Sequence, residues 1–392
     1  MKGQVVKQTR FKGRVLIIGG AGFIGSYTAD ELYKRGYKVR ILDNLSPKVH
    51  TNGWPVWVKP EYEKILGDER NKDDLYKSLE GADYVFDFAA EMDLMPEFSF
   101  FFENNVTSTA LLYELIVKHK FPVKKVVVAS TQFVYGEGRW ECYRHGVVYP
   151  SQRDSEKMAK GKWDPVCPLC KGKIAFLKSL EIHQEPSNQY AISKYAQELV
   201  ALRIGKLYGI PSAAMRYSIV HGPRQSMRNA YSGVLRVFTQ QIMAHKKLSI
   251  FEDGKQLRDY VSVYDVARAN VVVMENPRAN YENFNVGCGR GYTVLEIAKI
   301  VRNALGKDND EDYKKLEANG EFRVGDNRHA VSDITKLKRL GWRIKDSEEK
   351  IVKEYVEWAG KQKLERDYAM EAMESLRKSG ALRESRSPKR NR

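Results

Sequence analysis

The chain has 392 residues, of which 42% are hydrophobic and 30% are charged. This composition is typical of a folded water-soluble protein, and no apolar run reaches the roughly 18 to 20 residues that a membrane-spanning helix requires. The length allows one large α/β domain with a smaller lobe, or two domains. The segment from Met1 to Lys12 is polar and basic and lacks the apolar core of a signal peptide, so a cytoplasmic location is expected.

The net charge is +16, from 66 basic and 50 acidic side chains. Such an excess is compatible with nucleic-acid binding, and equally with a solvated basic surface that handles an anionic small molecule. Part of the excess lies in residues 377–392, a basic stretch that is predicted to be a disordered tail. We favour the solvated surface with a basic tail, so nucleic acid is not an expected partner.

Apolar runs of β type alternate with helical patterns through the first half of the chain. Strands are expected over residues 15–18, 39–42, 84–88, 126–130 and 213–217. Helices are expected over residues 22–35, 106–118 and 190–208. Continuous apolar strands separated by helices indicate a parallel sheet covered on both faces. The predicted fold class is α/β, with a Rossmann-type doubly wound parallel sheet.

The periodic pattern changes at several points, which suggests an organisation into parts. Residues 13–220 are predicted to form the dinucleotide-binding domain, interrupted by an irregular Cys/His-containing insertion over 137–187. Residues 221–345 have shorter elements and are predicted to form mainly a smaller substrate-binding lobe. A long helical pattern over 346–376 precedes the basic tail.

A glycine-rich segment follows the first predicted strand directly. Gly19, Gly22 and Gly25 make the pattern GxxGxxG between that strand and the next predicted helix. Glycine permits positive φ in a tight turn, and the missing Cβ lets a pyrophosphate approach the backbone. The N–H groups near Phe23 and Ile24 begin a helix whose N-terminus attracts the anion. Because the pattern stands between a strand and a helix, it indicates dinucleotide binding.

An acidic residue, Asp43, stands at the end of the next strand, about 20 residues after the glycine pattern. A carboxylate in this place accepts hydrogen bonds from the adenosine ribose and repels a 2′-phosphate, which favours NAD over NADP. Asp43 could instead cap a turn, because Asn44 and Ser46 follow it. Ribose binding is the interpretation that we favour.

A tyrosine and a lysine form a YxxxK pair in a predicted helix. Tyr190 and Lys194 are four residues apart and therefore share a helix face, so the ammonium is expected to lie near the phenol and to lower its pKa. Thr131 ends a predicted strand upstream, at the edge where ligands bind in open α/β sheets. The three residues are predicted to be catalytic, with Thr131 bonded to a substrate oxygen.

Three of the four cysteines lie in the insertion. Cys142 and His145 form a CxxH pair, and Cys167 and Cys170 form a CxxC pair. Tetrahedral zinc takes four nitrogen or sulfur ligands from two such pairs, and a structural zinc would stabilise a segment with little core of its own. A cluster of reduced thiols, or a Cys167–Cys170 disulfide, remains as an alternative.

Together these motifs resemble the extended short-chain dehydrogenase/reductases, the NAD-dependent epimerase/dehydratase family, from about Arg14 to Trp358. The resemblance implies a homodimer built through the helices near 106–118 and 190–208. It also implies that Arg258 and Arg323 hold the diphosphate of a nucleotide sugar, since guanidinium groups suit bidentate phosphate binding. Further cofactor contacts that it implies are Asn44, Asp68 at the adenine, Ala89, Ala90 and Asn105, together with Tyr190 and with Lys194 at the nicotinamide ribose.

Two departures from the family pattern narrow the reaction. Dehydratases of the family carry Asp-Glu after the catalytic threonine, whereas Gln132 and Phe133 occupy these positions here and argue against dehydration. The asparagine that often follows the family's arginine is absent after Arg216, which puts part of the glycosyl-phosphate contact in doubt.

The Cys/His insertion makes the chain most similar to 4-epimerases of dTDP-L-rhamnose. The sequence thus predicts an NAD-dependent nucleotide-sugar 4-epimerase that acts on that sugar or on a UDP-hexose. A dehydrogenase, reductase or decarboxylase of the same family, and a catalytically idle nucleic-acid-binding relative, are the alternatives.

Overall fold

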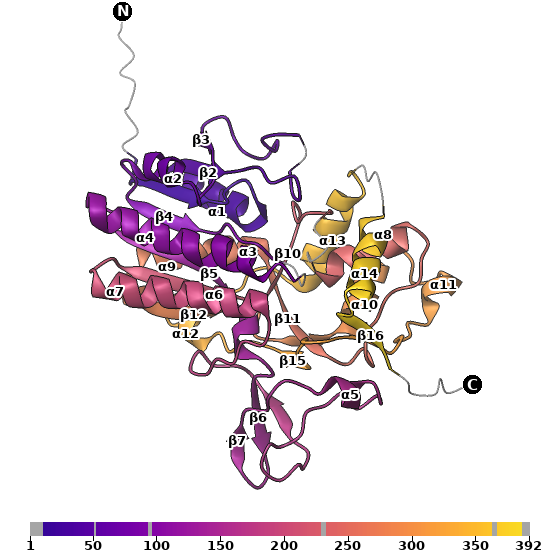
Figure 1. Ribbon diagram of the computed structural model, residues 1–392. Helices are drawn as coiled ribbons and strands as arrows, with labels where there is room; N and C mark the ends of the chain where they lie inside the picture. Colours follow the sequence, from indigo (N-terminus) through magenta and orange to yellow (C-terminus); the bar gives the residue numbers. More distant parts are fainter. Residues whose placement is uncertain (1–10, 51, 93–95, 229–232, 363–366, 386–392) are drawn as a thin grey trace, which may run out of the picture.

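The computed structural model describes residues 11–50, 52–92, 96–228, 233–362 and 367–385. Figure 1 shows a sheet-based lobe on the left, a smaller lobe on the right and an insertion that projects below both. Within the described ranges, no helix is both long enough and apolar enough to cross a membrane.

A seven-stranded sheet forms the first lobe, and every neighbouring pair of its strands is parallel. The strand order is β12-β9-β5-β4-β1-β2-β3, which is the doubly wound α/β arrangement that the sequence predicts. The bounds are β1 Arg14–Ile18, β2 Lys38–Asp43, β3 Glu63–Leu66, β4 Tyr84–Asp87, β5 Lys125–Thr131, β9 Ser212–Tyr217 and β12 Glu282–Val286.

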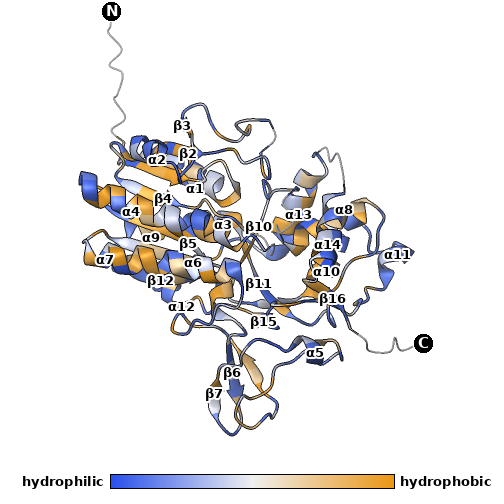
Figure 2. Ribbon diagram, in the orientation of Figure 1, coloured by the Kyte–Doolittle hydropathy of each residue, from blue (hydrophilic) through white to orange (hydrophobic). Residues whose placement is uncertain are grey.

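Successive apolar side chains point to opposite faces of this sheet, so each face has its own core. Val15 and Ile17 pack on the side of α1 (Phe23–Lys34) and α9 (Val263–Glu275). Leu16 and Ile18 pack on the side of α2 (Lys72–Leu79), α4 (Ser108–His119) and the segment that continues α6 (Gln189–Leu199). In Figure 2, α4 and α6 carry both hydrophobic and hydrophilic residues, as expected of helices packed with one side on a sheet.

A π-helical turn overlaps the beginning of the helix expected over 106–118, and another lies within the helix expected over 190–208. A π turn, η1 (Glu103–Thr107), joins α3 (Phe98–Phe102) to α4, and a second, η3 (Val200–Ile204), joins α6 to α7 (Gly205–Leu207). Hydrophobic periodicity identifies the helices but not the extra residue that a π turn inserts.

The smaller lobe contains a second sheet with the order β10-β11-β13, and β15 pairs with β11. Its strands are β10 Ile219–His221, β11 Leu257–Ser262, β13 Gly291–Thr293 and β15 His329–Ala330. The helices here are α8 Val234–Met243, α10 Val294–Ala304 and α11 Glu311–Lys314, whereas α12 Thr335–Lys338 contacts β12 and packs on the core of the first lobe through Leu337. The described residues also include the 3₁₀ turns η2 Gln132–Tyr135, which follows β5, and η4 Pro277–Ala279, which follows α9.

The predicted division at residue 221 is wrong in one respect. Helix α9 and strand β12 come from the stretch assigned to the smaller lobe, yet both belong to the first lobe. The chain enters the second lobe at β10, returns to complete the large sheet, leaves again, and comes back to the first lobe at α12.

The C-terminal part also differs from the prediction of one long helix over 346–376. The structure has two helices, α13 (Glu348–Ala359) and α14 (Tyr368–Lys378). The predicted tail begins inside α14 and continues as β16 (Leu382–Glu384), which pairs antiparallel with β14 (Glu321–Arg323). The remainder of that predicted tail, residues 386–392, lies outside the described residues.

The insertion is more regular than the sequence indicates. It contains a three-stranded antiparallel sheet with the order β7-β6-β8, and one helical turn, α5. The bounds are β6 Arg139–Cys142, β7 Gly146–Val148, α5 Ser155–Met158 and β8 Ala175–Leu177. A small core around Trp140, Val148 and Cys167 fills it.

Buried ion pairs fasten the insertion to the smaller lobe. The Arg153 guanidinium contacts Glu137 at 3.0 Å and Glu252 at 2.9 Å, and Glu252 also pairs with Arg328 at 2.9 Å. At most 4% of each of these four side chains is exposed. A charge in such surroundings requires its partner, since water cannot replace it.

We expect Arg153→Ala to lower the free energy of unfolding by about 3–5 kcal/mol, because it leaves buried carboxylates without their main counter-charge. Urea unfolding followed by circular dichroism measures the loss. Lys157→Ala, on the exposed side of α5, is the control and should change the free energy by no more than about 0.5 kcal/mol. Equal effects of the two substitutions would contradict a role of the network in fastening the insertion.

Candidate active site

The glycine-rich turn joins β1 to α1 in a form that only glycine allows at two positions. Gly19 has φ +73°, and a Cβ at Gly19 would lie 2.7 Å from the Ala89 nitrogen. A Cβ at Gly25 would lie 2.3 Å from the Gly19 oxygen. Gly22 precedes α1, and no side chain caps the beginning of this helix in the described structure. The N–H groups at Phe23 and Ile24 therefore begin an uncapped helix, as an anion site requires.

Asp43 ends β2 and lies against this turn. Its carboxylate accepts the Ala21 N–H and the Leu45 N–H, each at 2.9 Å. The turn-capping interpretation of Asp43 thus holds, and it does not exclude ribose binding, because a carboxylate has further lone pairs. The Trp57 indole, which the sequence analysis did not single out, donates to the Ala21 oxygen at 3.0 Å and covers the turn.

Asn44 and Asp68 lie together beyond the ends of β2 and β3. The Asn44 amide donates to Asp68 at 3.0 Å, and the Arg70 guanidinium donates to both Asp68 oxygens at 2.9 and 2.7 Å. These bonds with Arg70 hold the pKa of Asp68 well below its usual range. The two predicted adenosine contacts are therefore brought together by the fold.

The segment after β4 passes beside the glycine turn. The Phe88 N–H donates to the Ile18 oxygen, which places Ala89 against Gly19 and leads on to Ala90. Asn105, in the π turn η1, accepts the Glu91 N–H at 2.9 Å and donates to Ser193 Oγ at 2.9 Å. Because Asn105 is fully buried, we assign it a positioning role between this segment and α6.

Thr131 and Tyr190 meet at the end of β5. Thr131 is the last residue of that strand, and its hydroxyl also accepts the Phe133 N–H at 3.3 Å. Asn188 caps α6 by accepting the Ala191 N–H, which fixes Tyr190 in the first helical turn. Burial raises the pKa of Tyr190 to about 12, and its hydrogen bond with Thr131 opposes the rise.

Lys194 does not contact the phenol as its spacing predicts. Its ammonium donates to Gln197 Oε1 on the same helix, and only 1% of the side chain is exposed. Among the described residues, burial and Thr131 account for the pKa of Tyr190, so the expected lowering by Lys194 is absent in this structure. The i,i+4 spacing places two residues on one face, but long side chains choose among several partners.

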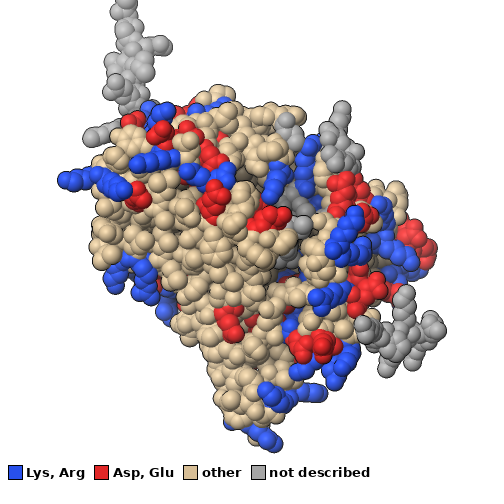
Figure 3. Space-filling model, in the orientation of Figure 1, with Lys and Arg blue, Asp and Glu red and all other residues tan. Residues whose placement is uncertain are grey.

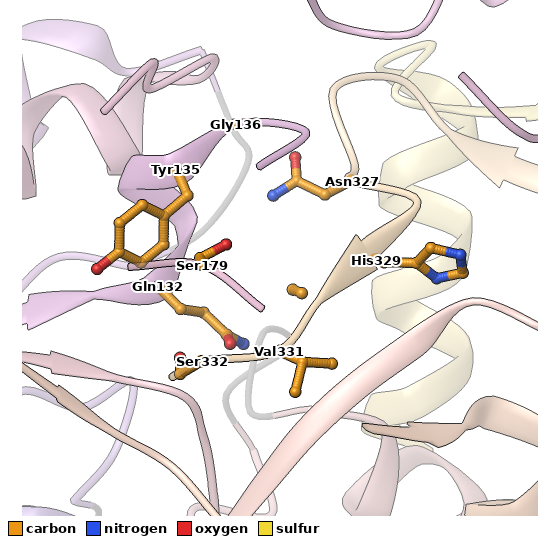
Figure 4. A pocket seen from close by; sticks show the side chains of 9 residues that line it. Gln132, Tyr135, Gly136, Ser179, Asn327, His329, Val331 and Ser332 are labelled. Atoms are coloured by element: carbon orange, nitrogen blue, oxygen red, sulfur yellow. The ribbon is translucent and has the colours of Figure 1, made fainter. Parts of the chain in front are cut away.

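Gln132 and Phe133, the positions that depart from dehydratases, lie beside Thr131. Gln132 is buried and lines a narrow space too small to admit a water molecule. Figure 4 shows its amide directed toward Ser332 and Val331 from the smaller lobe. Neither amide atom has a hydrogen-bond partner among the described residues. The absence of a carboxyl group here agrees with the sequence argument against dehydration.

The predicted phosphate ligands are engaged within the chain. Arg258 is buried and donates to Asp326 at 3.0 Å and to the backbone oxygens of Leu257, Asn327 and Arg328. The Arg323 guanidinium lies over the Phe251 ring at 5.2 Å. Both arginines help to hold the pKa of Asp326 below its usual range, although burial opposes this. Arg258 and Arg323 therefore lie near the same carboxylate, Asp326.

Arg216, the family position with the missing asparagine, serves the scaffold. Its guanidinium forms a fully buried pair with Glu198 of α6 at 2.5 Å, and contacts the Tyr135 hydroxyl at 3.0 Å. This pair fastens β9 to the helix that carries Tyr190 and Lys194. We assign it no contact with substrate.

The two cysteine pairs of the insertion converge on one point. Cys142 Sγ lies 3.5 Å from His145 Nδ1 and 3.7 Å from Cys170 Sγ, and Cys167 Sγ lies 3.5 Å from His145 Nδ1. All four ligand atoms lie within 4.8 Å of one another. All four cysteines of the chain are free thiols, so the alternative Cys167–Cys170 disulfide is not formed. The backbone N–H of Cys170 lowers the pKa of Cys167 to about 6, which favours the thiolate.

Comparisons with known proteins agree with this geometry. The model of the NAD dependent epimerase/dehydratase family matches residues 15–157 and 169–287. A dTDP-L-rhamnose 4-epimerase of Burkholderia thailandensis is 30% identical over 354 residues, which covers 88% of this chain and 94% of the relative.

Solved structures of nucleotide-sugar epimerases are also similar to this chain. A UDP-glucose 4-epimerase of Thermotoga maritima with UDP-glucose is 30% identical with a TM-score of 0.69, covering 89% of this chain and 99% of that one. A Thermus thermophilus UDP-glucose 4-epimerase in complex with NAD is 26% identical with a TM-score of 0.69. The similarity covers 89% of this chain and 100% of that one. The chain therefore belongs to the NAD dependent epimerase/dehydratase family.

Proposed function

We propose that the protein is an NAD-dependent nucleotide-sugar 4-epimerase. The observation that carries the proposal is the Thr131–Tyr190 hydrogen bond at the carboxyl edge of the sheet whose glycine turn begins α1. The relatives named above act on dTDP-L-rhamnose or UDP-glucose, so a dTDP-6-deoxyhexose or a UDP-hexose is the proposed substrate class. The uncharged positions at Gln132 and Phe133 favour epimerisation over dehydration.

The glycine turn fits the pyrophosphate of NAD, because Cβ atoms at Gly19 and Gly25 would collide with backbone. Asp43 would accept the hydroxyls of the adenosine ribose, with Asn44 and Asp68 at the adenosine end. The neighbouring residues Ala89, Ala90 and Asn105 would border the cofactor. When bound, NAD supplies the acceptor and the donor of a hydride at C4 of the sugar.

Tyr190 is the proposed acid and base for the C4 hydroxyl, and Thr131 holds the same oxygen. A phenol with a pKa of about 12 is protonated at neutral pH, so it needs a nearby positive charge to act as a base. We propose that Lys194 supplies this charge by turning from Gln197 toward Tyr190 in the loaded enzyme. Arg258 and Arg323 would then face the diphosphate as its nearest guanidinium groups.

We expect the purified protein to interconvert the C4 epimers of at least one of dTDP-L-rhamnose, UDP-glucose and UDP-glucuronate, resolved by proton NMR. Tyr190→Phe should lower the rate by about 10²–10⁴-fold, because the general acid–base group is lost, while NAD binding persists. Tyr208→Phe, at an exposed position beyond the same helix, is the matched control and should keep the rate.

Other outcomes of this assay would contradict the proposal and favour an alternative function. Stoichiometric NADH formation would indicate a dehydrogenase, and loss of CO₂ from UDP-glucuronate would indicate a decarboxylase. Salt-dependent binding of nucleic acid without any sugar conversion would support the idle relative instead.

We further propose a structural zinc ion bound by Cys142, His145, Cys167 and Cys170. Tetrahedral zinc with bonds of about 2.0–2.3 Å places its ligand atoms roughly 3.5–3.8 Å apart, which agrees with the three separations given above. Four protein ligands leave no open position for substrate, so the role is structural.

Elemental mass spectrometry should find one zinc per chain in the purified protein, and Cys167→Ser should lose it together with part of the thermal stability. Cys288→Ser is the matched control, because the Cys288 thiol lies outside the cluster and contacts the Arg290 oxygen. A chain without zinc after expression in zinc-supplemented medium would refute the site.

A homodimer through α4 and α6 is the proposed assembly. Phe98 and Phe102 of α3 and Ile192 and Leu199 of α6 are at least 38% exposed, and α3 contacts α6. In Figure 3, the face in front of α4 and α6 contains few charged side chains. An exposed apolar face on neighbouring helices suits a second copy of the same chain.

We expect sedimentation equilibrium to give twice the mass of one chain. Leu199→Glu should shift the protein toward the monomer by placing a charge in the apolar interface. Leu169→Glu, at an exposed tip of the insertion, should leave the mass unchanged. A wild-type monomer at micromolar concentration would contradict the proposed assembly.

A further inference from the structure

Two buried carboxyl groups lie close enough to Lys194 to act on its charge, although neither forms a direct ion pair with it, and they have no place in the chemistry described above. Asp87 ends β4 and is fully buried, and Glu69, in the turn before α2, is 7% exposed. Both act electrostatically on Lys194. Two carboxyl groups and one ammonium thus share a space that water hardly reaches.

Hydrogen bonds join this cluster to the catalytic helix. Asp87 Oδ2 accepts the Thr109 hydroxyl at 2.6 Å and the Gln197 amide at 3.1 Å. The same Gln197 side chain accepts the Lys194 ammonium through its Oε1 atom. Gln197 therefore connects the lysine to Asp87 and orients both.

The second oxygen of Asp87, Oδ1, receives no hydrogen bond from any nitrogen or hydroxyl of the described residues. The Glu69 carboxyl is a hydrogen-bonding partner of Asp87, and Glu69 is also bonded to the Ser108 side chain. Two carboxylates cannot share a hydrogen bond unless one of them is protonated. Burial raises the pKa of Glu69 well above its usual range, and the charge of Asp87 is the second largest cause.

We propose that Glu69 and Asp87 share one proton, and that ionised Asp87 is the counter-charge that keeps Lys194 an ammonium within the core. Neutral Glu69 donates to Asp87 Oδ1, Asp87 carries one negative charge, and Lys194 carries one positive charge, so the cluster is neutral overall. Asp87 and Glu69 are positioning residues, because they act through Lys194.

The arrangement explains how Lys194 can keep its positive charge although it is buried. Burial lowers the pKa of Lys194 to about 8, and the nearby carboxyl groups oppose this fall. A neutral amine could not stabilise the phenolate of Tyr190. The other charged groups near the cluster, Asp68 and Arg70, are paired with each other at 2.7 Å, so Asp87 is the carboxylate left to balance the lysine.

The charge of Lys194 can be measured directly in the cofactor-free full chain. Carbon-13 NMR of lysine-labelled protein follows the ε-carbon shifts with pH, and the spectrum of Lys194→Met assigns the resonance. We expect a midpoint near pH 8 in the wild type. Asp87→Asn should lower it by about one to three pH units, because the opposite charge is gone. Glu69→Gln should leave it near the wild-type value, because the amide replaces a neutral donor.

The matched pair of amide substitutions distinguishes the proposal from a packing role. An unchanged midpoint in Asp87→Asn, or an equal fall in Glu69→Gln, would overturn it. If circular dichroism shows that Asp87→Asn does not fold, Gln197→Glu is the second test. A carboxylate beside the Lys194 ammonium should raise the midpoint of the Lys194 titration. An unchanged midpoint would refute the proposal.

The catalytic consequence rests on the proposed function, whereas the NMR readout does not. In an active epimerase, deprotonation of Lys194 should limit kcat/KM at high pH, and Asp87→Asn should move that limb to lower pH. A chain without epimerase activity would leave the NMR result intact, so the two proposals fail separately.

Discussion

The alignment of parallel strands at one edge of the sheet is the constraint on which the site depends. Ile18 of β1, Asp87 of β4 and Val128 of β5 lie side by side in register, so the chain leaves all three strands toward the same edge. Strand β5 runs three residues further and ends at Thr131. The glycine turn, the buried carboxyl pair and Thr131 are therefore neighbours because of backbone pairing, although they are far apart in the sequence.

Features set by local backbone geometry were predictable from the sequence. The glycine turn, the strand that ends at Thr131 and the helix that begins before Tyr190 each follow from spacing and residue type within a short window. The two-pair ligand set of the insertion is equally local. By contrast, the return of β12 and α9 to the large sheet depends on contacts between distant segments, which periodicity does not record.

The partners of charged side chains were the least predictable part of the site. A sequence shows that Lys194, Arg216 and Arg258 carry charge, but a long side chain can reach several partners. In the structure each has an intramolecular acceptor: Gln197, Glu198 and Asp326 respectively. Because a buried charge is costly without a partner, the fold selects these contacts before any ligand binds. Asp87 could not be identified either, since its significance comes from Glu69 and Lys194 together.

The insertion stands between Thr131 and Tyr190 in the sequence, which raises the question of how firmly it couples to them. It leaves η2 at Gly136, and it rejoins the scaffold where the Glu185 N–H donates to the Val134 oxygen at 2.8 Å. This bond closes the insertion at its base, so Thr131 and Tyr190 are held by β5 and α6 rather than by the end that carries the Cys/His cluster. The contact between the insertion and the smaller lobe runs through the Arg153 ion pairs, which share no residue with the Cys/His cluster. The Cys/His cluster and the Thr131–Tyr190 pair are therefore held by separate parts of this fold.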